Sequence, residues 1–102
     1  MLYLVTITYA VPKAVIEPHL PAHREWLMTH ARSGRFIVAG PLADHSGGVI
    51  VADCDSREQL DSLLAQDAYQ QHGVAHYTVQ AFNAALRAAA FPAHWAPDAK
   101  AA

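Results

Sequence analysis

Residues 36–54 read FIVAGPLADHSGGVIVADC, and this stretch decides the fold class. Its two apolar runs, residues 36–40 and 48–54, are rich in the β-branched and aromatic residues that favour strands. Between them, residues 42–47 contain the Asp, Ser and Gly that are typical of turns. The stretch therefore predicts two consecutive strands joined by a loop.

A helix is predicted on each side of this strand pair. On the N-terminal side, residues 20–32 form a helical segment, and Gly34 supplies a stop at its end. On the C-terminal side, Ser56 and Gln59 form a capping-box pattern at the start of a helix over residues 57–66. The strand pair is thus enclosed between two helices.

The outer segments complete the pattern. Leu2–Tyr9, with the sequence LYLVTITY, predicts a first strand, and residues 10–18 form a connection to the first helix. Residues 68–72 predict a further helical turn stopped by Gly73, and residues 76–82 predict the last strand. The order β-α-β-β-α-β predicts an α+β, ferredoxin-like fold with a four-stranded sheet and both helices on one face.

The chain divides into a domain over residues 1–83 and a C-terminal extension over residues 84–102. The Ala-rich residues 84–90 predict a short helix, whereas residues 91–102 contain two prolines and are expected to form a tail.

The strands carry apolar residues at both odd and even positions, as in Tyr3, Leu4 and Val5. This pattern is typical of a sheet that is buried on both faces. Because the chain supplies helices for one face only, we expect a second copy to cover the other face. The sequence therefore predicts a homodimer and leaves further association open.

Composition excludes several classes of protein. Hydrophobic residues make up 53% of the 102 residues and charged residues only 16%, which excludes intrinsic disorder. No stretch approaches the ~20 apolar residues of a membrane-spanning helix. A net charge of −2 with seven Lys and Arg argues against a nucleic-acid partner. Cys54 is the only cysteine, so a disulfide framework is excluded and the reducing cytoplasm is the expected location.

Seven histidines stand out in a chain of this size, and His23 has the most informative position. On a helical projection it lies at the edge of the apolar stripe formed by Leu20, Leu27 and Met28. A pocket wall would lie at this rim. One interpretation is that His23 packs at the helix edge and bonds a carbonyl; the other is that it reaches a ligand.

Asp67 lies where the second helix ends, and it also has two interpretations. It could cap the next helical turn. It could also accept a hydrogen bond from an imidazole that acts as a base.

The sequence offers little support for a metal or cofactor. His19 and His23 are four residues apart, which is suitable for a divalent cation, but a third ligand is not fixed among His45, His72, His76 and His94. No cofactor-binding motif is present, and we expect neither a cofactor nor a metal.

Several of these pieces together resemble the YciI-like (YCII-related) family. They are His23-Arg24 early in the first helix, the segment GRFIVAGP from Gly34 to Pro41, and Asp67-Ala68-Tyr69 followed by Gly73-Val74. The resemblance extends over roughly residues 2–83.

The resemblance implies a dimeric α/β barrel of ferredoxin-like subunits, with a catalytic His–Asp pair in a pocket. The pair corresponds to His23 and Asp67. One branch of the family is linked to the dehydrohalogenation of chlorinated hydroxyquinols. Two positions depart from the family pattern, since Ala68 replaces a proline and Gly48 replaces a frequent serine.

We therefore predict a small-molecule enzyme of the lyase or isomerase type that uses general acid–base chemistry without a cofactor. His23 is the predicted base or acid, and Asp67 fixes its tautomer across a contact of about 2.6–3.2 Å.

The remaining site residues are predicted to bind the ligand. Gly40 and Pro41 shape the mouth of the pocket, while Trp26 and Tyr69 stack on a small ligand. The alternative function is a non-catalytic module that binds a small ligand or another protein. An open cavity beside the pair favours catalysis, whereas a pair that is packed shut favours the alternative.

Overall fold

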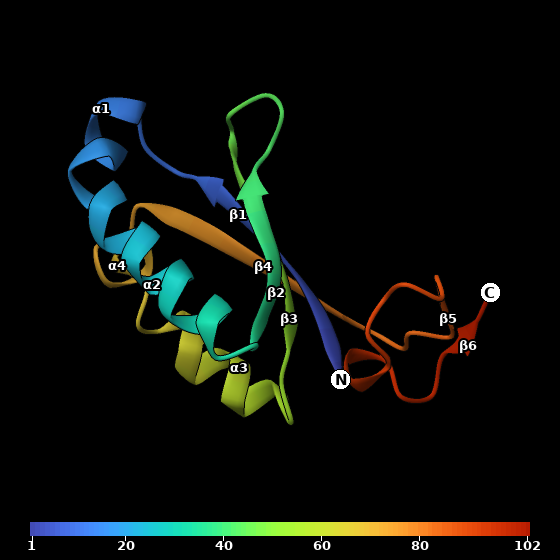
Figure 1. Ribbon diagram of the computed structural model, residues 1–102. Helices are drawn as coiled ribbons and strands as arrows, with labels where there is room; N and C mark the ends of the chain where they lie inside the picture. The colour runs from blue at the N-terminus through green and yellow to red at the C-terminus, as the bar shows by residue number, and fades with distance from the viewer.

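The computed structural model describes residues 1–102 and contains one main antiparallel sheet with its helices on one face (Figure 1). The sheet has the strand order β2-β3-β1-β4. Its strands are β1 (Leu2–Tyr9), β2 (Phe36–Pro41), β3 (Gly47–Asp53) and β4 (Ala75–Phe82). This is the predicted α+β, ferredoxin-like arrangement.

Two longer helices and several short ones cover the sheet. The helical elements of the domain are α1 (Lys13–Ile16), the 3₁₀ turn η1 (Glu17–His19), α2 (Leu20–Arg32), α3 (Arg57–Leu64) and α4 (Ala68–Gln71). None of these helices has the length and apolar character needed to cross a bilayer.

The bounds of β1 and α2 agree with the sequence prediction; β2 and β4 differ from it by one residue at one end, and β3 by one residue at each end. The predicted connection over residues 10–18 is instead largely helical. Proline explains the difference, because Pro12 precedes α1 and Pro18 occupies the first turn of η1, where its missing N–H costs nothing.

The core lies between the sheet and the helices. In β1, Tyr3, Val5 and Ile7 are buried beneath the helices, while the alternate residues Leu4 and Thr6 lie on the opposite face. This opposite face has no helical layer (Figure 1). The domain is therefore a two-layer structure with one open sheet face.

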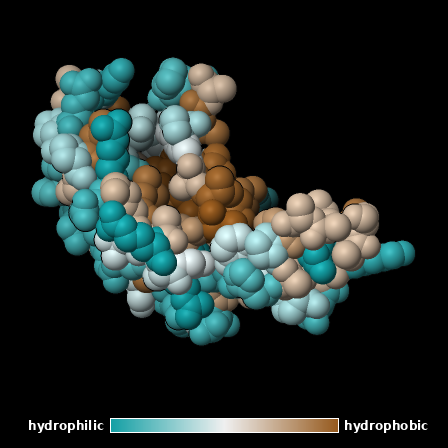
Figure 2. Space-filling model, in the orientation of Figure 1, coloured by the Kyte–Doolittle hydropathy of each residue, from teal (hydrophilic) through white to brown (hydrophobic).

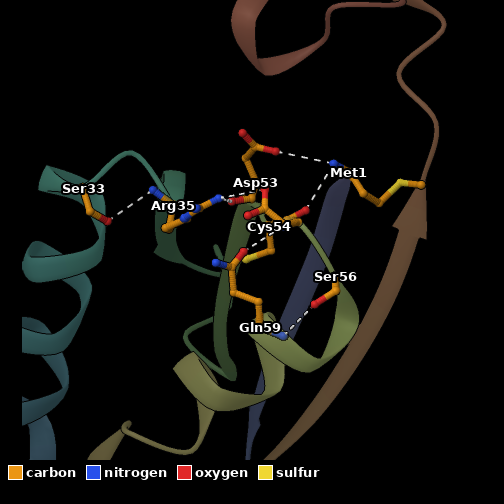
Figure 3. A network of polar contacts seen from close by, with 8 residues as sticks. Met1, Ser33, Arg35, Asp53, Cys54, Ser56 and Gln59 are labelled. Carbon is orange, nitrogen blue, oxygen red and sulfur yellow. Dashed lines mark hydrogen bonds and ion pairs between the residues drawn. The ribbon is translucent and has the colours of Figure 1, made fainter.

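Polar contacts connect the start of β1 with the segment between β3 and α3 (Figure 3). The Met1 ammonium donates to the carbonyl of Cys54 at 3.2 Å. The Ser56 hydroxyl accepts from the Gln59 backbone N–H at 3.1 Å, which confirms Ser56 as the N-cap of α3. The Gln59 side chain in turn accepts from the N–H of Asp55 at 2.7 Å. These bonds set where α3 begins.

The C-terminal extension is not helical over residues 84–90, so that prediction was wrong. The segment instead forms β5 (Leu86–Arg87), which pairs in parallel with β6 (Lys100–Ala101), with the 3₁₀ turn η2 (Ala93–Trp95) between them. Figure 1 shows this unit projecting from the body of the domain. A short Ala-rich helix needs tertiary packing to be stable, and a projecting segment has little.

One close backbone contact fixes how β3 enters the sheet. Gly47 pairs with Thr8, and a Cβ atom at Gly47 would lie 1.7 Å from the carbonyl oxygen of Ile7. Only glycine fits there without a backbone shift. At Gly40, by contrast, a Cβ atom would meet nothing within 4 Å.

We expect Gly47→Ala to lower the free energy of unfolding by about 3 kcal/mol, because β1 and β3 must move apart. Gly40→Ala serves as the control and is expected to change it by less than about 0.5 kcal/mol. Urea unfolding followed by circular dichroism measures both. Equal stability of the two variants would contradict this account of the close contact.

Candidate active site

The structure brings His23 and Asp67 together across 44 residues of sequence. His23 Nδ1 lies 2.8 Å from Asp67 Oδ1. The Asp67 side chain is fully buried, whereas 12% of the His23 side chain is exposed. A carboxylate oxygen can only accept, so Nδ1 carries the hydrogen and Nε2 is left as the free ring nitrogen. The pair has the geometry of a base whose tautomer is fixed by an acid.

Asp67 makes both of the contacts that its sequence position suggested, one to the next helical turn and one to an imidazole. As N-cap of α4, its Oδ1 accepts the backbone N–H of Tyr69 at 3.2 Å. Its Oδ2 accepts the hydroxyl of Tyr77. Both oxygens of the buried Asp67 side chain therefore have hydrogen-bond partners.

Tyr77 is a residue that the sequence analysis missed. It lies on β4 opposite Ile7 of β1, on the face of the sheet that the helices cover. The sequence signal that could have identified Tyr77 is the alternation of apolar and polar residues in β4, which places Tyr77 on the covered face. Burial, together with the bond to Asp67, raises the pKa of the Tyr77 phenol well above its usual value. The phenol therefore remains a hydrogen-bond donor at neutral pH.

Tyr69 and Trp26 flank the imidazole in different ways. The Tyr69 ring stacks on the His23 ring, with centroids 4.0 Å apart and planes within 10°. The Trp26 indole lies 5.5 Å from His23, and its N–H donates to the carbonyl of Leu63 at 2.9 Å. Trp26 is buried in the core and does not line the cavity described below. Of the two aromatic residues predicted to stack on a ligand, Tyr69 alone borders that cavity.

A cavity of about 380 Å³ lies beside His23. Its walls include His23, Tyr69, Gly40 and Pro41, and side chains from β1, α1 and α2. Figure 2 shows a hollow in this part of the molecule, between the N-terminal helices and the loop that joins β2 to β3. The volume is within the ~300–1,000 Å³ range of small-molecule sites. His23 thus borders an open cavity, while Asp67 is buried behind it.

The other histidines do not assemble around His23. His19 belongs to η1 and not to α2, and its ring stacks on that of His72 at 4.1 Å. His30 bonds the Gln66 side chain at 2.8 Å, outside the cavity. No group of three or more His, Cys, Asp or Glu side chains is arranged to hold a metal ion.

Cys54 is fully buried at the far end of β3. Burial raises the pKa of its thiol, which keeps the sulfur protonated and unreactive.

The comparisons with known proteins agree with this fold. A dehydrochlorinase for 5-chloro-2-hydroxyhydroquinone from Burkholderia phenoliruptrix, solved with 2,5-dihydroxybenzoquinone, has a TM-score of 0.68 at 19% identity. The match covers 80% of this chain and 93% of that one. A muconolactone isomerase has a TM-score of 0.65 at 20% identity, with coverage of 88% and 93%. At these identities the two structures show the fold alone.

A search of the curated proteins finds no match. The model of the YCII-related domain, however, matches residues 1–83, which is most of the chain and contains both His23 and Asp67. The chain therefore belongs to the family of the YCII-related domain.

Proposed function

We propose that this protein is a small-molecule enzyme that moves a proton without a cofactor, in an isomerisation or an elimination. One observation carries the proposal. The His23 ring lines an open cavity, its Nδ1 is bonded to the buried Asp67 carboxylate, and its Nε2 is free. This arrangement is typical of a general base. An interaction module does not require a histidine of fixed tautomer in the wall of a concave site.

In the proposed reaction, His23 Nε2 removes a proton from an acidic carbon of the bound ligand. The imidazolium that forms is stabilised by the Asp67 carboxylate through the Nδ1–H bond. The electron pair left on the ligand shifts into a neighbouring π bond. In an isomerisation His23 returns the proton to another carbon, and in an elimination a leaving group departs with its bonding electrons.

The surrounding groups position the pair. Tyr77 and the Tyr69 N–H hold the Asp67 carboxylate, and the stacked Tyr69 ring limits rotation of the imidazole. Gly40 and Pro41 border the cavity and would shape the approach of the ligand. The two similar structures are named as a dehydrochlorinase and an isomerase. These names describe an elimination and an isomerisation, the two reaction types proposed here, and so support the proposal.

Exchange of ligand hydrogen for solvent deuterium tests the proposed proton transfer directly. The protein is incubated in D₂O with muconolactone or with 5-chloro-2-hydroxyhydroquinone, and loss of the C–H signal is followed by NMR. Product formation is followed in the same spectra. We expect exchange or conversion by the wild type, a loss of about 10²–10⁴-fold in His23→Ala, and a loss of at least tenfold in Asp67→Asn.

His30→Ala is the matched control, because His30 lies on the same helix but outside the cavity. The imidazole ¹⁵N shifts supply a second readout, since Asp67→Asn should release His23 from the Nδ1–H tautomer. If His23→Ala and His30→Ala behave alike in the exchange assay, the proton-transfer proposal is wrong.

Tyr77 gives the protein a predicted dependence of stability on alkaline pH. Its folded-state pKa is raised above the ordinary value of 10.0, so the unfolded chain loses the phenol proton first as the pH rises. The stability contributed by this group is therefore complete below pH 10 and decreases above it. Urea unfolding from about pH 8 to about pH 11 should show a shallower decrease for Tyr77→Phe than for the wild type. Parallel decreases would contradict the assignment.

We further propose that the open sheet face joins two copies in a homodimer. This face carries Leu4, Val51 and Val38, and 62% of the Val38 side chain is exposed. Figure 2 shows apolar surface on this side, above the C-terminal extension. The half of this face formed by β2 and β3 is apolar, whereas Thr6, Thr78 and Gln80 make the half at β4 polar. An exposed apolar patch with a polar border is typical of an interface.

Sedimentation velocity tests the homodimer. We expect the wild type to sediment as a dimer and Val38→Lys as a monomer, because the new charge would be buried in the interface. Met28→Lys is the control, since Met28 is similarly exposed but lies on α2. A wild-type monomer, or equal behaviour of both variants, would exclude this interface.

The buried free thiol of Cys54 supports the cytoplasm as the site of action. The net charge of −2 supports a small-molecule ligand over nucleic acid.

A further inference from the structure

Three basic residues from separate elements line the cavity beside His23. They are Lys13 on α1, Arg24 on α2 and His45 in the loop between β2 and β3. No aspartate or glutamate is among the lining residues. Asp67, the nearest carboxylate to His23, is fully buried and is already bonded to it. The lining therefore has positive charge and no acidic group to balance it.

The two permanent charges are also free of ion pairs within the chain. Arg35 and Arg57 each lie within 3.5 Å of an aspartate, whereas neither Lys13 nor Arg24 lies within ion-pair distance of a carboxylate. The neighbouring Glu25 does not line the cavity. Unpaired cations at the edge of a concave site attract anions and orient them by charge-assisted hydrogen bonds.

In the loop between β2 and β3, the backbone conformation directs His45 toward the cavity and the Asp44 carboxylate away from it. His45 adopts a left-handed backbone conformation with φ of 61°, which is uncommon outside glycine. The preceding Asp44 is turned toward Ser46, whose N–H and hydroxyl donate to its Oδ1 at 3.0 Å and 2.6 Å. These bonds lower the pKa of Asp44 and satisfy its carboxylate locally. The result is that His45 borders the cavity and Asp44 does not.

We propose that the cavity selects small organic anions with an apolar body, such as carboxylates or phenolates, over neutral molecules of the same shape. Lys13 and Arg24 hold the anionic group, and His45 adds a third positive charge when it is protonated. The apolar body contacts side chains of the wall such as Leu20, Leu27 and Ile50. This inference rests on the proposed function, since it names the substrate class of the same site.

Benzoate and benzamide provide a matched pair of probes, because they differ in charge but scarcely in shape. Each is titrated into the wild-type protein at low ionic strength, and the resonances of the His23 ring and the Leu27 methyl groups are followed by NMR. We expect benzoate to bind about tenfold or more tightly than benzamide, and added salt to reduce this difference.

Charge-removing variants locate the effect. Lys13→Met and Arg24→Met should each weaken benzoate binding by about three- to tenfold and leave benzamide binding unchanged. Lys100→Met is the control, because it removes the same charge from β6, away from the cavity. Amide NMR spectra of each variant establish that it is folded before its affinity is compared.

The outcomes separate this proposal from the proposed function. Equal binding of benzoate and benzamide, binding of neither, or equal losses in Lys13→Met and Lys100→Met would each overturn anion selection. The deuterium-exchange assay is independent of these results. If anion selection is observed but His23-dependent exchange is absent, the cavity is an anion-binding site and the proposed proton transfer fails.

Discussion

The buried carboxylate of Asp67 is the constraint on which the functional part of the structure depends. A charge removed from water costs several kcal/mol unless hydrogen bonds replace its hydration. Three donors replace it here: the His23 ring on α2, the Tyr69 N–H at the start of α4, and the Tyr77 hydroxyl on β4. Each donor comes from a different element, so satisfying one charge also fixes how these elements sit together.

Part of the cavity wall is backbone without side chains. Gly40, Gly47 and Gly48 all line it, and none of them contributes a side chain that could fill it. At Gly48, where the family pattern often has serine, a Cβ atom would come within 3.1 Å of the Gly40 carbonyl oxygen. Across the cavity, Pro12 and Pro18 begin the short helices that bring Lys13 to its wall. The shape of the cavity therefore depends in part on glycines and prolines, which have no catalytic side chain.

Family membership and chemistry rest on different observations. The match to the YCII-related domain and the two similar structures show the fold. A fold of this kind accommodates many activities, so the reaction must be argued from the site. Three features of the site bear on the reaction: the free Nε2 of His23, the Asp67 carboxylate bonded to its Nδ1, and the basic residues that line the cavity. The first two indicate what the site can do to a ligand, and the third indicates which ligands it admits.

The sequence by itself determined the element order, because strand alternation, helix caps and turn residues act over a few neighbours. It predicted the bounds of β1 and α2, the cap at Ser56, and the candidate residues His23 and Asp67. Helical projection placed His23 at the edge of a stripe that included Met28, but Met28 is exposed and Trp26 is the buried residue of α2, so the buried face is rotated toward His23.

Only the tertiary structure decided what these residues contact. The register of β4 against β1 brings Tyr77 to Asp67. Trp26 is buried in the core, where its indole N–H bonds the Leu63 carbonyl, and it lies away from the cavity. Residues 84–90 have helical composition but no helix, since they project from the domain and pair instead with β6. Lys13, Arg24 and His45 meet at one cavity from three elements. Such convergence depends on chain packing over long separations, whereas periodicity and capping depend on residues a few positions apart.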